Sequence, residues 1–148
     1  MQNAASNEYL RQAVLTASPE QLQMMLYDGA IRFVRQARDA LVQNDLSTSC
    51  EKLIRAQKIV LELDHGLRPE VNPELCAQLS SLYQFVYRRL VDANIKRDLA
   101  ALDESLQIIE HQRETWRLLM EKIAADRGKA TRPAPSGPDS APRELASV

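Results

Sequence analysis

The chain has 148 residues, and its 19 Lys and Arg residues nearly balance its 20 Asp and Glu residues, which gives a formal net charge of −1. So weak a charge does not attract nucleic acid or an anionic membrane without specific contacts. Hydrophobic residues make up 45% and charged residues 26% of the chain, which is typical of a globular domain and not of a disordered chain. We therefore expect one folded domain.

Residues that break helices are rare outside the carboxyl-terminal end. The chain has 4 Gly and 7 Pro, and Pro133, Pro135, Pro138 and Pro142 all follow residue 130. Because residues 19–127 contain few interruptions, an all-β or α/β fold is disfavoured. The sequence predicts an all-α protein.

Residues 1–17 begin with a polar stretch and lack the basic and apolar segments of a secretory signal. No run in the chain reaches the roughly 18 apolar residues of a membrane-spanning helix, so we expect a cytoplasmic protein without membrane insertion. We interpret this segment as too short to form a helix of its own. Its apolar residues are expected to pack on the rest of the domain: Tyr9, Leu10, Val14 and Leu15.

Helix start and stop signals divide residues 18–127 into four parts. Ser18, Pro19 and Gln21 combine an N-cap, a proline in the first turn and a capping box, which predicts a helix to about Gln43. Asp45 or Ser47 then caps a second helix that ends at Gly66.

Asn72 and Pro73 repeat the combination of cap and proline, which predicts a third helix to about Ile95. After a turn at residues 96–98, a fourth helix is expected to reach about Arg127. Four helices of similar length with short loops predict an antiparallel up-down-up-down four-helix bundle over residues 18–127. The Pro-rich residues 128–148 are expected to form a disordered tail.

Placed at about 100° per residue, the apolar residues of each helix form an inward stripe and a surplus. In the first helix the stripe is Leu22, Met25, Leu26, Gly29, Phe33, Ala37, Ala40 and Leu41, and the surplus is Met24, Tyr27, Ile31 and Val34. In the second helix the stripe is Leu53, Ala56, Val60, Leu63 and Leu67, and the surplus is Cys50, Ile54 and Leu61.

The third helix is expected to direct six residues inward: Leu75, Leu79, Leu82, Val86, Leu90 and Ala93. Tyr83 and Tyr87 flank that stripe, and Phe85 is expected on the exposed face. The seam of the fourth helix is Leu99, Leu102, Leu106, Ile109, Trp116, Met120 and Ile123.

Two interpretations of the surplus remain open. In one, the extra apolar residues cover one another and the amino-terminal segment. In the other, they form an exposed groove that binds an amphipathic helix of a partner protein.

Sequence motifs for metal binding and catalysis are mostly absent. The sequence from Glu62 to His65 matches the Glu-x-x-His pattern of carboxylate-bridged di-iron proteins, but such a site needs two of these motifs, and Ile108 stands three residues before the second histidine, His111. His65 is explained instead by the helix dipole, which favours it at a carboxyl-terminal end. No Gly-rich phosphate loop or Gly-x-Ser-x-Gly motif occurs. We expect no metal, no cofactor and no enzymatic activity.

The two cysteines and the basic residues also have structural explanations. Cys50 and Cys76 open two successive antiparallel helices, which places them about 30 Å apart by helix rise and beyond disulfide reach. Acidic residues such as Asp28 and Asp92 alternate with the arginines, so a salt-bridged surface is expected in place of a nucleic-acid site.

Four linked motifs resemble the flagellar secretion chaperone family FliS. They are Thr16-Ala17-Ser18-Pro19-Glu20-Gln21-Leu22, Leu26-Tyr27-Asp28-Gly29-Ala30, Lys52-Leu53-Ile54-Arg55-Ala56-Gln57-Lys58-Ile59, and Leu82-Tyr83-Gln84-Phe85-Val86-Tyr87-Arg88-Arg89-Leu90 followed by Ala93-Asn94. The resemblance runs from about Tyr9 to Glu121. It implies a cytoplasmic four-helix chaperone, not an enzyme, that binds the carboxyl-terminal region of flagellin, prevents premature polymerisation and presents the subunit to the export gate protein FlhA.

The resemblance also implies partner-binding residues. In the family a tyrosine before the first bundle helix lies on the bundle and affects partner binding, and Tyr9 matches it. Together with the apolar surplus, the motifs give this set of expected contacts: Tyr9, Leu10, Met24, Tyr27, Ile31, Ile54, Leu61, Tyr83, Phe85, Tyr87 and Asn94. The free protein is expected to be a monomer or weak homodimer. A helical adaptor for another protein, such as an anti-sigma factor, is the alternative.

Overall fold

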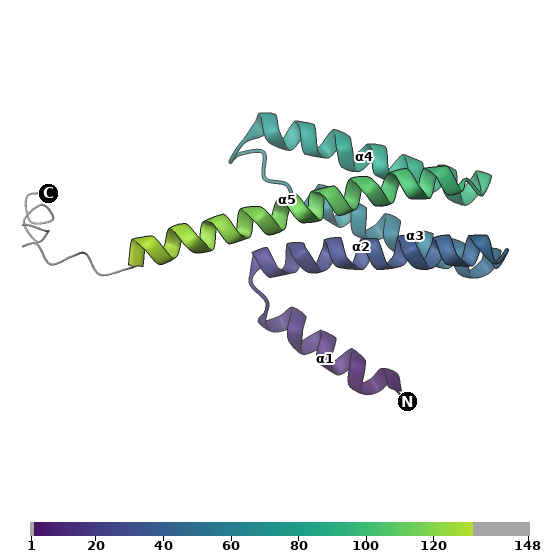
Figure 1. Ribbon diagram of the computed structural model, residues 1–148, viewed down its shortest axis with the longest axis horizontal. Coiled ribbons are helices and arrows are strands. Elements are labelled where there is room, and N and C mark those ends of the chain that lie inside the picture. Colours follow the sequence, from purple (N-terminus) through teal and green to yellow (C-terminus); the bar gives the residue numbers. More distant parts are fainter. Residues whose placement is uncertain (1, 132–148) are drawn as a thin grey trace, which may run out of the picture. The chain divides into compact units, whose positions relative to one another are not determined.

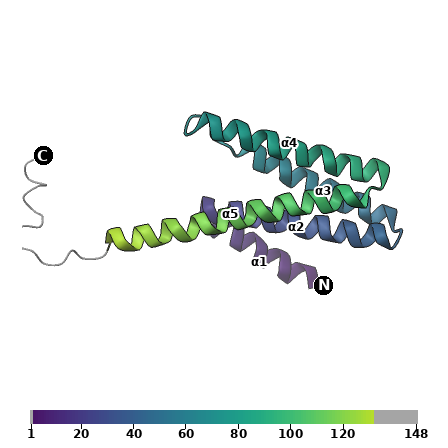
Figure 2. The ribbon, with the colours of Figure 1, turned by 45° about the horizontal axis from the view of Figure 1, so that its top comes forward.

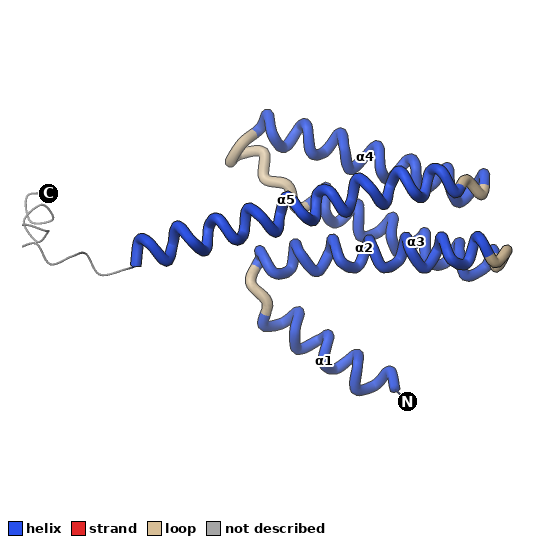
Figure 3. Tube along the Cα trace, viewed as in Figure 1, coloured by secondary structure: helices blue, strands red, loops and turns tan. Residues whose placement is uncertain are grey.

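The computed structural model describes residues 2–131, which form five α-helices and no strand (Figure 1). The helices are α1 (Gln2–Thr16), α2 (Pro19–Val42), α3 (Leu46–His65), α4 (Pro73–Lys96) and α5 (Leu99–Thr131). The prediction of an all-α fold is confirmed (Figure 3). Of the predicted tail, residues 128–131 belong to α5, and the remainder lies outside the described residues.

The expectation that the amino-terminal segment forms no helix is wrong, because α1 covers fifteen residues. The segment contains neither Gly nor Pro, and the Gln12 side chain donates a hydrogen bond to Glu8 one turn earlier. The helix ends just before Ser18-Pro19, where the proline disfavours helical geometry of the preceding residue. These local features favour α1.

The predicted helix starts are confirmed by their hydrogen bonds. The Ser18 hydroxyl accepts from the Gln21 backbone at 3.1 Å, and the Gln21 side chain accepts from the Ser18 backbone at 2.9 Å, which completes the capping box of α2. At the starts of α3 and α4 a single N-cap bond is present: the Asp45 side chain accepts from the Thr48 backbone, and the Asn72 side chain accepts from the Leu75 backbone. Hydrogen bonds from Thr48 hold the pKa of the Asp45 carboxyl below its ordinary value.

The chain divides into two compact units, Met1–Trp116 and Arg117–Val148, and the division falls within α5. The first unit contains α1 to α4 and the first half of α5. In the second unit Arg117 forms an ion pair with Glu121, and Leu118 and Leu119 are exposed. The predicted bundle range, 18–127, extends past this division.

Contacts between helices of the first unit show their relative directions. Asn94 near the end of α4 donates a hydrogen bond to the Sγ atom of Cys50 near the start of α3, at 3.5 Å. Arg38 near the end of α2 pairs with Asp103 near the start of α5, at 2.6 Å. Each of these pairs is antiparallel, and α3 lies beside α4 (Figure 2).

The core of the first unit draws on four helices. The largest completely or almost completely buried apolar side chains are Val34, Leu53, Leu63, Val60, Val86, Leu90 and Leu102. The predicted stripe of α3 is confirmed, since Leu53, Ala56, Val60 and Leu63 are buried and Leu67 is half-buried. These residues form the surface on which α2 and α4 pack.

The predicted stripes of the other helices are rotated relative to the structure. On α4, Tyr83 is buried beside Val86 and Leu90, whereas Leu82 is half-buried and Leu75 is 48% exposed. On α2 the expected inward residues Leu22, Met25, Leu26, Phe33 and Leu41 are only half-buried. On α5, Leu102 and Ile109 are buried as expected, but Leu99 is 36% exposed. On these helices the centre of the buried face is therefore rotated away from the stripe predicted from apolar residues alone.

Ser105 on α5 is completely buried, and its hydroxyl has no hydrogen-bond partner among the described residues. Ser105→Ala removes this unpaired polar group, so we expect the free energy of unfolding to rise by about 1 kcal/mol. Urea denaturation measures the change. Ser81→Ala on the exposed face of α4 is the control for helix propensity alone, and an equal gain there would contradict the role of burial.

Two further findings concern the described part of the chain. Within residues 2–131, each helix is too short or too polar to cross a lipid bilayer. In the same range no group of three or more His, Cys, Asp and Glu side chains is placed to hold a metal ion.

Candidate functional site

Tyr27 and Tyr83, both expected at the partner surface, lie in the core. They are 3% and 4% exposed, and their hydroxyl oxygens share a hydrogen bond of 2.6 Å between α2 and α4. The Gln23 side chain also donates to the Tyr27 hydroxyl, at 3.3 Å. The expectation of surface positions is therefore wrong, because each phenol buries its ring and satisfies its hydroxyl internally.

Burial raises the pKa of the Tyr83 hydroxyl, and the nearby Tyr27 hydroxyl and Asp64 carboxylate raise it further. Tyr83 therefore stays protonated at neutral pH. The pair links α2 to α4 through the hydrogen bond between the two hydroxyl groups.

Ile31 and Val34, the other surplus residues of α2, are 7% and 0% exposed. The expectation that they lie outside the core is also wrong. The physical reason is that α2 contacts more than one neighbouring helix, so its buried arc is wider than a single stripe. Met24, also on α2, is half-buried.

Two of the three surplus residues of α3 are at the surface as expected, whereas Cys50 is half-buried. Ile54 is 41% exposed and Leu61 is 36% exposed. The two residues are seven positions apart and so share one face of the helix. Leu61 lies beside half-buried Tyr87 of α4, where both side chains line a small hollow. The structure thus brings two of the predicted site residues together at the boundary of α3 and α4.

Two hollows follow this boundary. The smaller, of about 50 Å³, is lined by Val60, Leu61, Asp64, Tyr83, Gln84 and Tyr87. The larger, of about 240 Å³, lies toward the loop between the helices and is lined mainly by Leu67, Pro69, Pro73 and Ala77, with Asp64, Cys76 and Ser80. Because Asp64 lines both hollows, we treat them as one α3–α4 groove.

Asn94 lies at the opposite end of the α3–α4 boundary from the loop. Its hydrogen bond to Cys50 and its half-buried position give it a structural role between the two helices. Both cysteines are free thiols, as the sequence predicted, and each is half-buried.

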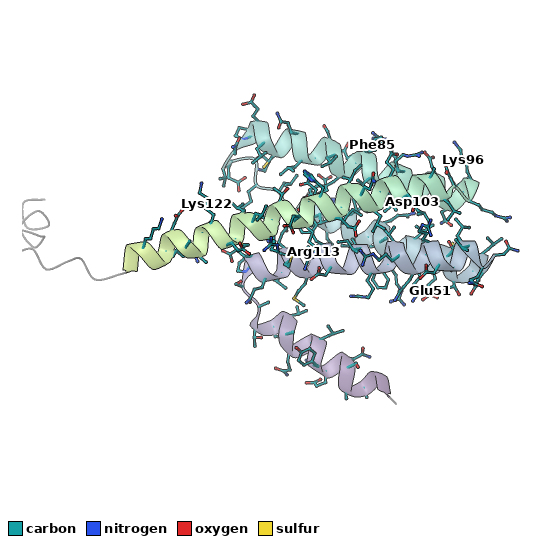
Figure 4. All side chains as sticks on the ribbon, in the orientation of Figure 1. Glu51, Phe85, Lys96, Asp103, Arg113 and Lys122 are labelled. Carbon is teal, nitrogen blue, oxygen red and sulfur yellow. The ribbon has the colours of Figure 1, made fainter. Side chains whose placement is uncertain are left out.

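Phe85 is half-buried and not exposed, which corrects the helical-wheel prediction. It lies on α4 (Figure 4) and lines a hollow of about 450 Å³ together with Tyr87, Arg88, Arg89, Val91 and Asp92. Phe85 does not line the α3–α4 groove. Tyr87 is the residue that the two surfaces share.

The apolar residues of α1 are at the surface. Tyr9 is 74% exposed, Leu15 67%, Leu10 50% and Val14 47%. This differs from the expectation that the segment packs on the bundle. An apolar set this exposed on a short helix is available to a partner.

A second groove, of about 500 Å³, lies between α2 and α5, and its character is ionic. Arg113 of α5 (Figure 4) pairs with Asp28 of α2, and Arg35 of α2 pairs with Glu110 of α5. The prediction of a salt-bridged surface is confirmed here. Such exposed pairs contribute little stability each, and they line this groove with charged groups.

Three cations surround the half-buried ring of Phe33 on α2. The guanidinium carbon of Arg32 is 5.0 Å from the ring centroid, and the Lys52 nitrogen and the Arg55 guanidinium carbon are each 5.7 Å away. Attraction between the cations and the ring stabilises this cluster at the boundary of α2 and α3.

The sequence interpretation missed the loop end of the groove and Asp64. Asp64 was not among the expected contacts, although the apolar residues Val60 and Leu61 precede it by one helical turn. One available signal is a carboxylate in the last turn of a helix, where the helix dipole disfavours negative charge.

Comparison with known proteins identifies the family. The family model described as flagellar protein FliS matches residues 1–123. The flagellar secretion chaperone FliS of Bacillus subtilis is 37% identical over 119 residues, which cover 80% of this chain and 88% of the relative. The same chaperone of Salmonella typhimurium is 36% identical over 113 residues, covering 76% of this chain and 84% of the relative.

A solved structure agrees with the fold. The crystal structure of a bacterial flagellar chaperone superposes with a TM-score of 0.66 at 20% sequence identity, over 82% of this chain and 99% of the other. The chain belongs to the FliS family of flagellar secretion chaperones.

Proposed function

We propose that this protein is a cytoplasmic export chaperone for flagellin. It binds the carboxyl-terminal region of flagellin, prevents the subunit from polymerising prematurely, and delivers the complex to the export gate protein FlhA. The proposal requires no cofactor and no catalytic group. Family membership supports the chaperone role, and the exposed apolar residues along the α3–α4 groove support a surface for a polypeptide.

The α3–α4 groove suits an amphipathic helix better than the α2–α5 groove does. Ile54 and Leu61 form an apolar edge along α3, Tyr87 borders the groove on α4, and the loop end is lined by Leu67 and Pro73. A helix that inserts apolar residues at intervals of three and four positions covers such a surface. We assign flagellin contacts to Ile54, Leu61 and Tyr87.

A flagellin segment that folds on binding gives up conformational entropy as it buries apolar area. The net affinity is then lower than the contact area alone suggests, which favours release at the export gate. The exposed residues of α1, Tyr9 and Leu10, are proposed as additional partner contacts, as are Met24 and Phe85.

We expect the purified protein to bind a peptide of the cognate flagellin carboxyl terminus with one-to-one stoichiometry. The heat-capacity change should be negative because apolar surface is buried and helix is formed. Isothermal titration calorimetry at several temperatures measures both quantities. Absence of binding would refute the flagellin proposal, and recovery of a different protein from a pull-down would favour the adaptor alternative.

A further inference from the structure

Asp64 has an unusual position in the α3–α4 groove. It is half-buried, it lines both hollows, and the other residues around it are mainly apolar. Its carboxylate acts electrostatically on the Tyr83 hydroxyl, and Tyr83 also lines the smaller hollow. A negative charge therefore lies at the centre of a surface otherwise suited to apolar side chains.

This charge is not compensated within the described part of the chain. The Asp64 carboxylate forms no hydrogen bond or ion pair with any of residues 2–131, whereas Asp28, Asp103 and Glu104 each pair with an arginine. The basic residues nearest in sequence, His65 and Arg68, are exposed and form no ion pair with it.

The helix adds to the electrostatic cost. Asp64 is the penultimate residue of α3, and the helix dipole disfavours negative charge at this end. A carboxylate without a hydrogen-bond or ion-pair partner can accept a charge-assisted hydrogen bond from a cation. A lysine or arginine brought into the groove would supply that bond.

We propose that the segment bound in the α3–α4 groove presents one lysine or arginine to Asp64, flanked by apolar residues. This inference rests on the proposed function, because it concerns the chemistry of the same bound segment. Charge complementarity selects a basic residue over a neutral one. The apolar residues that flank this basic residue in the bound segment contact Leu61 and Tyr87 on one side and Leu67 and Pro73 on the other. Asp64 thus determines which segment binds and in which register.

The first test compares Asp64→Asn with Glu62→Gln, using the cognate flagellin carboxyl-terminal peptide. Glu62 is an exposed carboxylate on α3 that lines neither hollow, so its neutralisation is a control for net charge. We expect Asp64→Asn to weaken binding about tenfold and to reduce its salt dependence, while Glu62→Gln binds as wild type does. Calorimetric titrations at low and high salt measure both effects.

A measurement of stability separates recognition from folding. We expect the melting temperature of Asp64→Asn to equal or exceed that of the wild type, because the unfavourable charge is removed. Weaker binding together with a lower melting temperature would assign Asp64 a structural role and overturn the inference. Unchanged binding and salt dependence would also overturn it, whereas failure of the wild type to bind would refute the proposed function itself.

A charge exchange provides the sharper test. Asp64→Lys places a cation where the helix dipole favours one, so the variant is expected to fold. It should bind the wild-type peptide at least tenfold more weakly through like-charge repulsion. One Lys→Glu or Arg→Glu substitution in the peptide should restore binding to Asp64→Lys and weaken binding to the wild type. If no basic residue of the peptide shows this exchange, the proposed contact is wrong.

Discussion

Leu90→Ala is expected to lower the free energy of unfolding by about 2–5 kcal/mol. Leu90 lies on α4, is completely buried, and belongs to the core to which α2, α3 and α5 also contribute. Truncation removes apolar contacts and leaves a cavity that the surrounding helices fill only in part. Thermal and urea denaturation followed by circular dichroism measure the loss.

Leu75→Ala is the matched control, because it makes the same change on the same helix. Leu75 is 48% exposed, so its truncation opens no cavity and is expected to cost less than about 1 kcal/mol. A helical wheel of the sequence assigns both leucines to one inward stripe and predicts similar losses. Equal losses would therefore contradict the packing of α4 described above.

The helix starts were predictable because their signals are local. The Ser18-Pro19 and Asn72-Pro73 pairs supply a side-chain acceptor and a fixed backbone angle within three residues of the helix start, and both caps are present in the structure. Cap chemistry depends little on distant residues. For this reason the bounds of α2, α3 and α4 differ little from the expected ones.

The rotation of each helix was less predictable, because it depends on neighbours distant in sequence. Tyr27 and Ile31 were interpreted as surplus, since Leu26 and Phe33 already supplied an apolar stripe. In the structure the arc through Tyr27 and Ile31 is buried, and Leu26 and Phe33 are only half-buried. Apolar periodicity indicates the width of a buried arc better than its centre.

The candidate site was predictable in part, for a related reason. Ile54 and Leu61 are apolar residues outside the inward stripe of α3, and both are exposed. On this helix an excess of apolar residues therefore indicated a surface position. For Asp64 the sequence offers only the weak signal of a carboxylate in the last turn of a helix. Many surface helices carry carboxylates, and only the surrounding fold leaves this one unpaired in a groove. Tertiary structure is required to distinguish an ordinary surface carboxylate from one that lies unpaired in a binding groove.

Tyr27→Phe is expected to lower the free energy of unfolding by about 2–3 kcal/mol, and Tyr83→Phe by only about 1 kcal/mol. The difference follows from what each change leaves behind. Without the Tyr27 hydroxyl, the Tyr83 hydroxyl is buried with no other hydrogen-bond partner among the described residues. Without the Tyr83 hydroxyl, Tyr27 still accepts from Gln23.

The double variant tests the pair directly. In the double variant both hydroxyls are absent, so no tyrosine hydroxyl of the pair is left without its partner. The double variant should therefore lose less free energy of unfolding than the two single variants lose together. Urea denaturation of the four proteins gives the coupling energy, and Phe keeps the aromatic ring in each case. Additive losses, or a larger loss in Tyr83→Phe than in Tyr27→Phe, would show that the two hydroxyls do not stabilise the contact of α2 with α4 as a pair.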